Sequence, residues 1–150
     1  MYNTAYRIVN QPDDAEDVMQ ESFIKAFGKL HSFKAISTFG AWLKRIVINE
    51  SLNWIRKHNT EKFVNIEKIN LPEFDDNNFD DTIDRNRINQ ILKSIMQLKD
   101  TYRIAMNLHF IEGYDYEEIA KIMHISYANA RTVISRAKTK IREELNTNIL

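Results

Sequence analysis

Apolar side chains in the first sixty residues recur every three or four positions, the spacing of helices that bury one face. This spacing predicts a helix to about residue 30, capped by Asp13, with Glu16 completing a capping-box-like pair and Pro12 just outside. A short amphipathic segment, 2–10, precedes this helix. The face of the helix opposite its apolar side chains is polar. The positions expected to be buried are Ala15, Val18, Met19, Phe23, Ala26, Phe27 and Leu30.

A second helix is predicted from just after Thr38 to about Lys57. We assign Trp42 to its core side and Trp54 to packing between helices. The positions expected to be buried are Phe39, Trp42, Leu43, Ile46 and Val47. One outward stripe at helical spacing consists of Arg45, Asn49, Asn53 and Arg56.

Four further helices are predicted after residue 85. The first has an apolar stripe formed by Ile88, Ile91, Leu92, Ile95 and Leu98. The next is expected to be capped by Asp100, to bury Ile104, Ala105 and Leu108, and to end at Gly113.

The last two predicted helices form a helix-turn-helix pattern. Asp115, with Glu118 three residues on, caps a short helix over 116–123, and Ser126 caps a long final helix after a tight turn at His124 and Ile125. The positions expected to be buried in the final helix are Ala130, Val133, Ile134, Ala137, Ile141 and Leu145.

The outer side of the final helix has the composition of a DNA-reading surface. Five cations and no acidic residue lie between Ser126 and Arg142. The side away from the core carries Ala128, Arg131, Thr132, Ser135, Arg136 and Thr139. Arginine matches guanine edges and hydroxyls reach phosphates or bases. A solvated basic helix on an ordinary bundle is the alternative.

The net charge of zero hides a difference between segments. Residues 1–59 hold 8 basic and 6 acidic side chains, 60–85 hold 3 and 8, and 86–150 hold 10 and 7. The segment 71–84 is rich in Asp and Asn and lacks a periodic apolar face. We therefore predict an all-α fold with two small helical domains, 1–58 and 86–150, joined by an acidic linker, 59–85. An ordered acidic loop packed by Phe74 and Phe79 is the alternative.

Composition excludes several classes of protein. The absence of Cys excludes a disulfide scaffold, Cys-ligated zinc and thiol catalysis, and three Gly leave no phosphate-cradling motif. The four His are scattered and no carboxylate pair stands out, so we expect no enzyme, no metal and no cofactor. No apolar run approaches the roughly 20 residues of a membrane span, and no secretory signal is present. We expect a cytoplasmic protein without membrane insertion.

Two pairs of strings resemble a known family. DAEDVMQESFIKAF (14–27) with FGAWLKRI (39–46) and Asn49 resembles region 2 of bacterial sigma factors of the extracytoplasmic-function (ECF) group. GYDYEEIA (113–120) with NARTVISRAK (129–138) resembles their region 4. The resemblance covers nearly the whole chain apart from the linker. The family has a further helix before this start, so we expect region 2 to lack its N-terminal helix.

The resemblance implies a dissociable specificity subunit of RNA polymerase core. In this family, region 2 docks on the β′ clamp and opens the −10 element, while region 4 sits on the β flap and reads the −35 element of promoter DNA. An anti-sigma factor is a further implied partner. The linker would thread toward the active-site channel, where Asp75, Asp76, Asp80 and Asp81 would stand in for nucleic-acid phosphates.

These roles map onto three sets of residues. The polymerase-binding set, an acidic face with an apolar anchor, is Asp14, Asp17, Gln20, Glu21 and Phe23. The −10 DNA-binding set is Lys44, Arg45, Asn49, Asn53, Arg56 and Lys57, preceded by a base-capturing loop over 31–38. The −35 DNA-binding set is Ala128, Asn129, Arg131, Thr132, Ser135, Arg136 and Lys138.

Two other functions remain open at this point. A stand-alone helix-turn-helix regulator would explain residues 86–150 but would leave the first domain without a role. A helical protein that binds polymerase or an anti-sigma factor without initiating transcription is the other.

Overall fold

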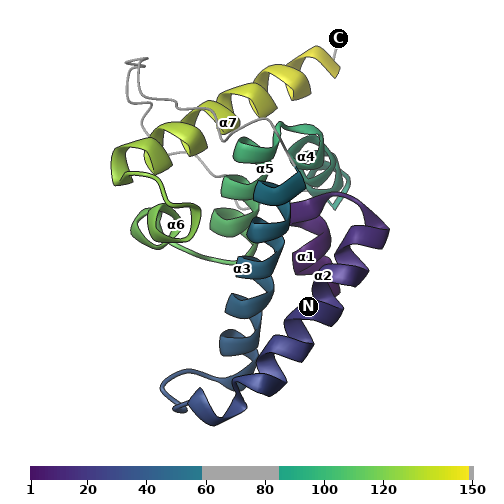
Figure 1. The fold of residues 1–150 in the computed structure, drawn as a ribbon. Helices are drawn as coiled ribbons and strands as arrows, with labels where there is room; N and C mark the ends of the chain where they lie inside the picture. The colour runs from purple at the N-terminus through teal and green to yellow at the C-terminus, as the bar shows by residue number, and fades with distance from the viewer. Residues whose placement is uncertain (59–84, 149–150) are drawn as a thin grey trace. The chain divides into compact units, whose positions relative to one another are not determined.

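The computed structural model describes residues 1–58 and 85–148, all of whose regular elements are helical (Figure 1). The chain divides into two compact units, Met1–Lys62 and Phe63–Leu150. The predicted all-α fold with two helical domains is confirmed. The linker predicted at 59–85, which includes the four aspartates and the two phenylalanines named above, lies outside the described residues apart from Arg85. Within the described ranges, no helix has both the length and the apolar character to cross a bilayer.

In residues 1–58, the described part of the first unit, three α-helices pack on one another: α1 (Tyr2–Val9), α2 (Pro12–Gly28) and α3 (Phe39–His58). A short 3₁₀ turn, η1 (Leu30–Ser32), follows α2. Helix α1 lies against both longer helices (Figure 1). Each of the three helices contributes buried apolar side chains to the core. The fully buried members of this core include Ala5, Ile8, Ala15, Val47, Ile48 and Leu52.

The start of α2 differs from the prediction. Asp13 is not its cap, because the helix already begins at Pro12, and the capping position is Gln11, which makes no side-chain hydrogen bond. Proline suits the first helical position, since it lacks the N–H that would be unsatisfied there and its φ is already helical. The beginning of α3 is as predicted, and the Thr38 hydroxyl accepts a hydrogen bond from the Ala41 N–H at 3.2 Å.

The buried face of α2 is shorter than predicted. It consists of Ala15, Val18, Ser22 and Ala26, whereas Phe27 is 71% exposed and Leu30 is also exposed. At 1.5 Å per residue, α1 is about 12 Å long and α2 about 26 Å, so α1 cannot cover all of α2. Phe39, at the start of α3, is exposed as well, contrary to the prediction.

The second unit consists of α4 (Arg85–Gln97), α5 (Asp100–Met106), a π-helical turn η2 (Asn107–Ile111), α6 (Tyr116–Met123) and α7 (Tyr127–Asn148). Helix α7 packs on α4, α5 and α6. The buried positions predicted in α5, η2 and α7 are confirmed up to Ile141, while Leu145 is half-buried.

Helix ends in the second unit follow local side-chain chemistry at α6 and α7. Asp115 and Glu118 form the predicted capping box, and Ser126 Oγ accepts from the Asn129 N–H at 3.1 Å. Asp100 is not a cap: Lys99 occupies that position, and the Asp100 carboxylate instead accepts from buried Arg103 at 2.6 Å. A carboxylate in the first helical turn can be drawn to a guanidinium one turn on in this way.

The apolar stripe of α4 is only partly buried. Ile95 lies in the core, Ile91 and Leu98 are half-buried, and Ile88 and Leu92 are exposed, contrary to the prediction. In this unit α5 and α7 are the helices that pack on α4. The buried part of α4 is therefore confined to Ser94 and Ile95, toward the C-terminal end of the helix.

Candidate nucleic-acid and protein interfaces

The outer face of α7 carries small side chains between two arginines. Ala130, Val133, Ala137 and Ile141 are buried, which fixes the direction of the core. At 3.6 residues per turn, the opposite direction is that of Ala128, Thr132, Ser135 and Thr139. Arg131 and Arg136 flank this row on its two sides. Ala128 and Arg131 are exposed and the others are half-buried.

Two hydroxyl groups on this face have a defined hydrogen-bonding direction. Thr132 Oγ1 donates to the Ala128 carbonyl at 2.9 Å, and Thr139 Oγ1 donates to the Ser135 carbonyl at 3.2 Å. Because each proton is used by the helix backbone, the oxygens are left as acceptors. In a major groove, such an oxygen can accept a hydrogen bond from the exocyclic amino group of adenine or cytosine. The threonine methyl group beside it can pack against the methyl group of thymine.

Two residues of the predicted −35 set lie at the edges of this face. The Lys138 ammonium is 5.3 Å from the centre of the Phe110 ring, which draws it toward η2. Asn129 is half-buried, and its N–H donates to the Ser126 hydroxyl. The remaining five, Ala128, Arg131, Thr132, Ser135 and Arg136, share one outward face or its immediate border.

The turn between α6 and α7 determines the direction of α7 relative to α6. His124 has a left-handed backbone with φ 57°, and the Ile125 N–H donates to the Ala120 carbonyl at 3.0 Å. Ala120 is buried, and its small side chain allows close helix packing. This is the geometry of the predicted helix-turn-helix.

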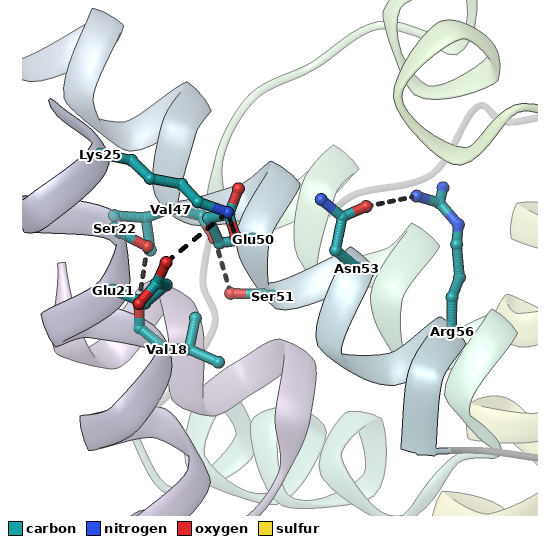
Figure 2. A network of polar contacts seen from close by, with 9 residues as sticks. All are labelled: Val18, Glu21, Ser22, Lys25, Val47, Glu50, Ser51, Asn53 and Arg56. Carbon is teal, nitrogen blue, oxygen red and sulfur yellow. Dashed lines mark hydrogen bonds and ion pairs between the residues drawn. The ribbon is translucent and has the colours of Figure 1, made fainter. Parts of the chain in front are cut away.

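Most of the predicted −10 set lies on one side of α3. Asn49, Asn53, Arg56 and Lys57 are exposed, and Arg45 is half-buried at the border. The Asn53 side-chain oxygen accepts a hydrogen bond from Arg56 at 3.2 Å, so the two groups are held together (Figure 2). Lys44 is different: helical geometry puts it about 150° from this stripe, near the buried side.

Three aromatic rings continue this side of α3 toward its N-terminus. Phe33, Phe39 and Trp42 form a cluster with ring centres 5.3–5.7 Å apart. Trp42 is half-buried rather than in the core, and it lies two turns before Asn49 on the same face. That spacing was present in the sequence and could have linked Trp42 with the asparagines. Trp54, by contrast, stacks on His58 at 4.3 Å, within its own helix.

The loop before α3 has a strained residue followed by an exposed apolar one. Ala35 has φ 56°, and Ile36 is 90% exposed. A left-handed backbone costs about 1–2 kcal/mol for a residue with a Cβ. Ile36 is not part of the core, so this loop, which lies within the predicted base-capturing segment, exposes an apolar side chain at its tip.

The acidic face of α2 has an apolar neighbour other than the predicted one. Asp17, Gln20 and Glu21 are exposed and Asp14 is half-buried. Phe23 is half-buried and lies on the opposite side of the helix from Asp14, so it does not stand beside the carboxylates. Ile24, which is 66% exposed, lies one turn after Gln20 and two turns after Asp17, with exposed Phe27 next to it.

An ion pair ties this face of α2 to α3. Lys25 Nζ donates to Glu50 Oε2 on α3 at 2.6 Å and lies 3.8 Å from Glu21 (Figure 2). The hydrogen bond to Glu50 raises the pKa of Lys25, partial burial opposes this, and the charges of Glu50 and Glu21 add to it. Close by, the buried hydroxyls of Ser22 and Ser51 donate to the Val18 and Val47 carbonyls, so both hydroxyl groups have a hydrogen-bond partner.

Two family models match the chain, one in each unit. Residues 1–61 match Sigma-70 region 2, and residues 88–141 match Sigma-70, region 4. A helical protein with these two regions in this order is a sigma factor of the sigma-70 type.

Individual relatives show which group of sigma factors this chain resembles. The ECF RNA polymerase sigma factor SigW of Bacillus subtilis is 28% identical, over 97% of this chain and 82% of SigW. SigM of the same organism is 30% identical, over 90% of this chain and 82% of SigM. The chain therefore belongs to the ECF RNA polymerase sigma factors, which are transcription initiation factors. The resemblance found in the sequence is confirmed.

A solved structure supports the same fold over both units. The sigma factor RpoE of Bartonella quintana, in complex with the anti-sigma factor NepR, aligns with a TM-score of 0.63 and 26% identity. The alignment covers 97% of this chain and 89% of that one.

Proposed function

We propose that this ECF sigma factor divides promoter recognition between its two units, with residues 1–58 acting as region 2, 86–150 as region 4 and 59–85 as the connection. The observation that carries the proposal is that α3 and α7 have exposed faces of different chemistry. Each face suits a different form of DNA.

The face of α7 suits the duplex of the −35 element. A row of small side chains lets the helix approach base edges closely, and Arg131 and Arg136 border it. Arginine binds guanine with two hydrogen bonds. The Thr132 hydroxyl, whose proton is donated to the Ala128 carbonyl, can accept a hydrogen bond from an amino group of a base. Asn129 and Lys138, at the edges, suit backbone contacts.

The face of α3 suits the opened strand of the −10 element. Unpaired bases bind by stacking on aromatic rings and by hydrogen bonds to their exposed edges. The cluster of Phe33, Phe39 and Trp42 supplies rings, Asn49 and Asn53 supply amides, and Arg56 supplies charge. Arg45 and Lys57 bind the phosphate backbone of the DNA, whereas the position of Lys44 near the buried side of α3 favours a structural role.

The exposed face of α2 suits docking on the polymerase core. Asp17, Gln20 and Glu21 surround Ile24, an apolar centre with a polar rim, as in many protein interfaces. We assign this face to the β′ clamp, and the second unit to the β flap. Asp14 completes the rim, and Phe23 supports the helix from its other side.

An anti-sigma factor is a further proposed partner. Support comes from the relative of similar fold, which was solved with the anti-sigma factor NepR. Polymerase core and promoter are cytoplasmic, so we propose that the chain acts there, without catalytic groups of its own.

Run-off transcription with purified core polymerase and a selected promoter tests the function. We expect a transcript that depends on this chain. A stand-alone regulator would bind the promoter without core and give no transcript, and an antagonist would bind core and give none.

A pair of variants tests the docking face. Asp17→Arg should weaken core binding at least tenfold, because it reverses a charge beside Ile24, whereas Glu16→Arg, an exposed charge reversal about 100° away on α2, should have little effect. The measurement is affinity for core by fluorescence anisotropy of the labelled chain. Equal affinities for the two variants would contradict this assignment.

A further inference from the structure

The first residue of α7 has a large aromatic side chain that lies outside the core. Tyr127 follows the capping residue Ser126 and is 52% exposed. Tyrosine combines an apolar ring with a hydroxyl group, and such residues often have a binding role when they are exposed beside a functional surface.

A row of rings holds the Tyr127 ring in place. Its edge-to-face contact with Tyr116, the first residue of α6, has centres 6.3 Å apart and planes at 88°. Tyr116 in turn stacks on His109 of η2 at 4.9 Å, and His109 Nδ1 lies 2.8 Å from the Tyr114 carbonyl. A side chain already held in one orientation loses less conformational entropy on binding.

The register of Tyr127 puts it at the border of the groove-facing surface. It precedes Arg131 by one turn on the same flank, about 110° from the row of Ala128, Thr132 and Ser135. When a helix lies in the major groove, the middle of its outer face meets base edges. Residues at the border meet the sugar–phosphate walls, and contacts there fix position rather than sequence.

We propose that the Tyr127 hydroxyl donates a hydrogen bond to a backbone phosphate of the −35 duplex and so sets the position of α7 in the groove. The inference rests on the proposed role of α7. A phenol is a good donor to an anionic oxygen, and it forms this contact without adding charge.

The test compares Tyr127→Phe with the unchanged chain, both assembled with core polymerase. Phenylalanine keeps the ring contact with Tyr116 and removes only the hydroxyl. Binding is measured on a selected promoter and on the same promoter with a substituted −35 element, over a range of salt concentrations. Tyr102→Phe, a half-buried tyrosine on α5 whose ring lies under Lys140, is the matched control.

We expect Tyr127→Phe to weaken both complexes by about three- to tenfold and to leave their affinity ratio unchanged. The salt dependence should also stay the same, because no cation is removed, whereas Arg131→Ala changes the ratio or the slope. Tyr102→Phe should bind normally.

Two results would overturn the inference. Normal binding by Tyr127→Phe would show that the hydroxyl has no contact with DNA, and a loss on the selected promoter alone would show that it reads a base. If Arg131→Ala also binds normally on both promoters, the proposed role of α7 itself fails, a result distinct from failure at Tyr127 alone.

Discussion

The two helices proposed to face DNA, α3 and α7, differ in what surrounds their outer faces. Helix α7 follows a capped turn, and its outward row is small and hydroxylic. Helix α3 follows a loop with a left-handed Ala35 and an exposed Ile36, and its outward row begins with aromatic rings. A duplex has a fixed groove that a rigid, smooth helix can enter, while unpaired bases need rings and an adaptable loop.

The largest predicted effect concerns the core beneath α7. Ile134→Ala should lower the free energy of unfolding of the second unit by about 2–4 kcal/mol, because Ile134 is fully buried and its removal leaves a cavity. Ile88→Ala, on the exposed part of α4, should cost less than about 1 kcal/mol. Urea unfolding followed by circular dichroism measures both, and equal losses would mean that the burial pattern is wrong.

Arg131→Ala sharpens the distinction between the two DNA faces. Loss of a guanine contact should cost about 1–3 kcal/mol of −35 binding, and binding to a template already open at the −10 element should fall much less. Competition binding of holoenzyme to matched templates measures this. An equal loss for every −35 sequence would make Arg131 a phosphate contact.

Removal of the α6 cap tests whether side chains define this helix-turn-helix. Asp115→Ala should destabilise the second unit by about 1 kcal/mol, because the Glu118 N–H loses its acceptor. Asp13→Ala, which removes an exposed carboxylate from the first turn of α2, should cost only about 0.3 kcal/mol through the helix dipole. Thermal unfolding measures the pair, and a larger effect at Asp13 would restore it as a cap.

The smallest predicted effect is at the tie between α2 and α3. Lys25→Met should cost about 0.5–1 kcal/mol at neutral pH, since the Lys25 side chain is 40% exposed and Glu50 is 16% exposed. Lys121→Met is the control, because Lys121 and Glu117 are both 70% exposed and their pair should contribute almost nothing.

The same pair predicts a pH dependence with a definite sign. The folded pKa of Lys25 is raised above the ordinary 10.5, so its contribution is complete below that value and is lost as pH rises through the raised pKa. The stability difference between the unchanged chain and Lys25→Met should therefore shrink above about pH 10.5. A difference that persists there would mean that packing of the Lys25 stem, not its charge, matters.

Local chemistry explains which parts of the fold were predictable from sequence. Asp115 with Glu118, and Ser126, mark helix starts by hydrogen bonds to their own neighbours, and those starts were predicted correctly. At Asp13 the same reasoning was wrong, because Pro12 is already suited to the first helical position. The π-helical turn at η2 has no comparable local signal.

The candidate faces were predictable in direction but not in extent. Spacing shows that a helix has an apolar side, but not how much of its length a partner covers, so Phe27, Phe39 and Ile88 were wrongly expected to be buried. Trp42 was assigned to the core for the same reason, although it is half-buried beside the asparagines. Ile24, which is exposed beside the acidic face, was not singled out in the sequence. The length of α1 limits how much of the buried face of α2 is covered, and this length is defined by the three-dimensional structure.

Permanganate reactivity of thymines in the −10 element, measured on holoenzyme with promoter DNA, tests the division of roles most directly. We expect Trp42→Leu to leave the promoter bound but the thymines unreactive, because leucine keeps apolar bulk and removes the stacking ring. Arg131→Ala should reduce binding and reactivity together, with reactivity recovering at higher holoenzyme concentration. Normal strand opening by Trp42→Leu, or persistent failure of opening in bound Arg131→Ala complexes, would contradict the account.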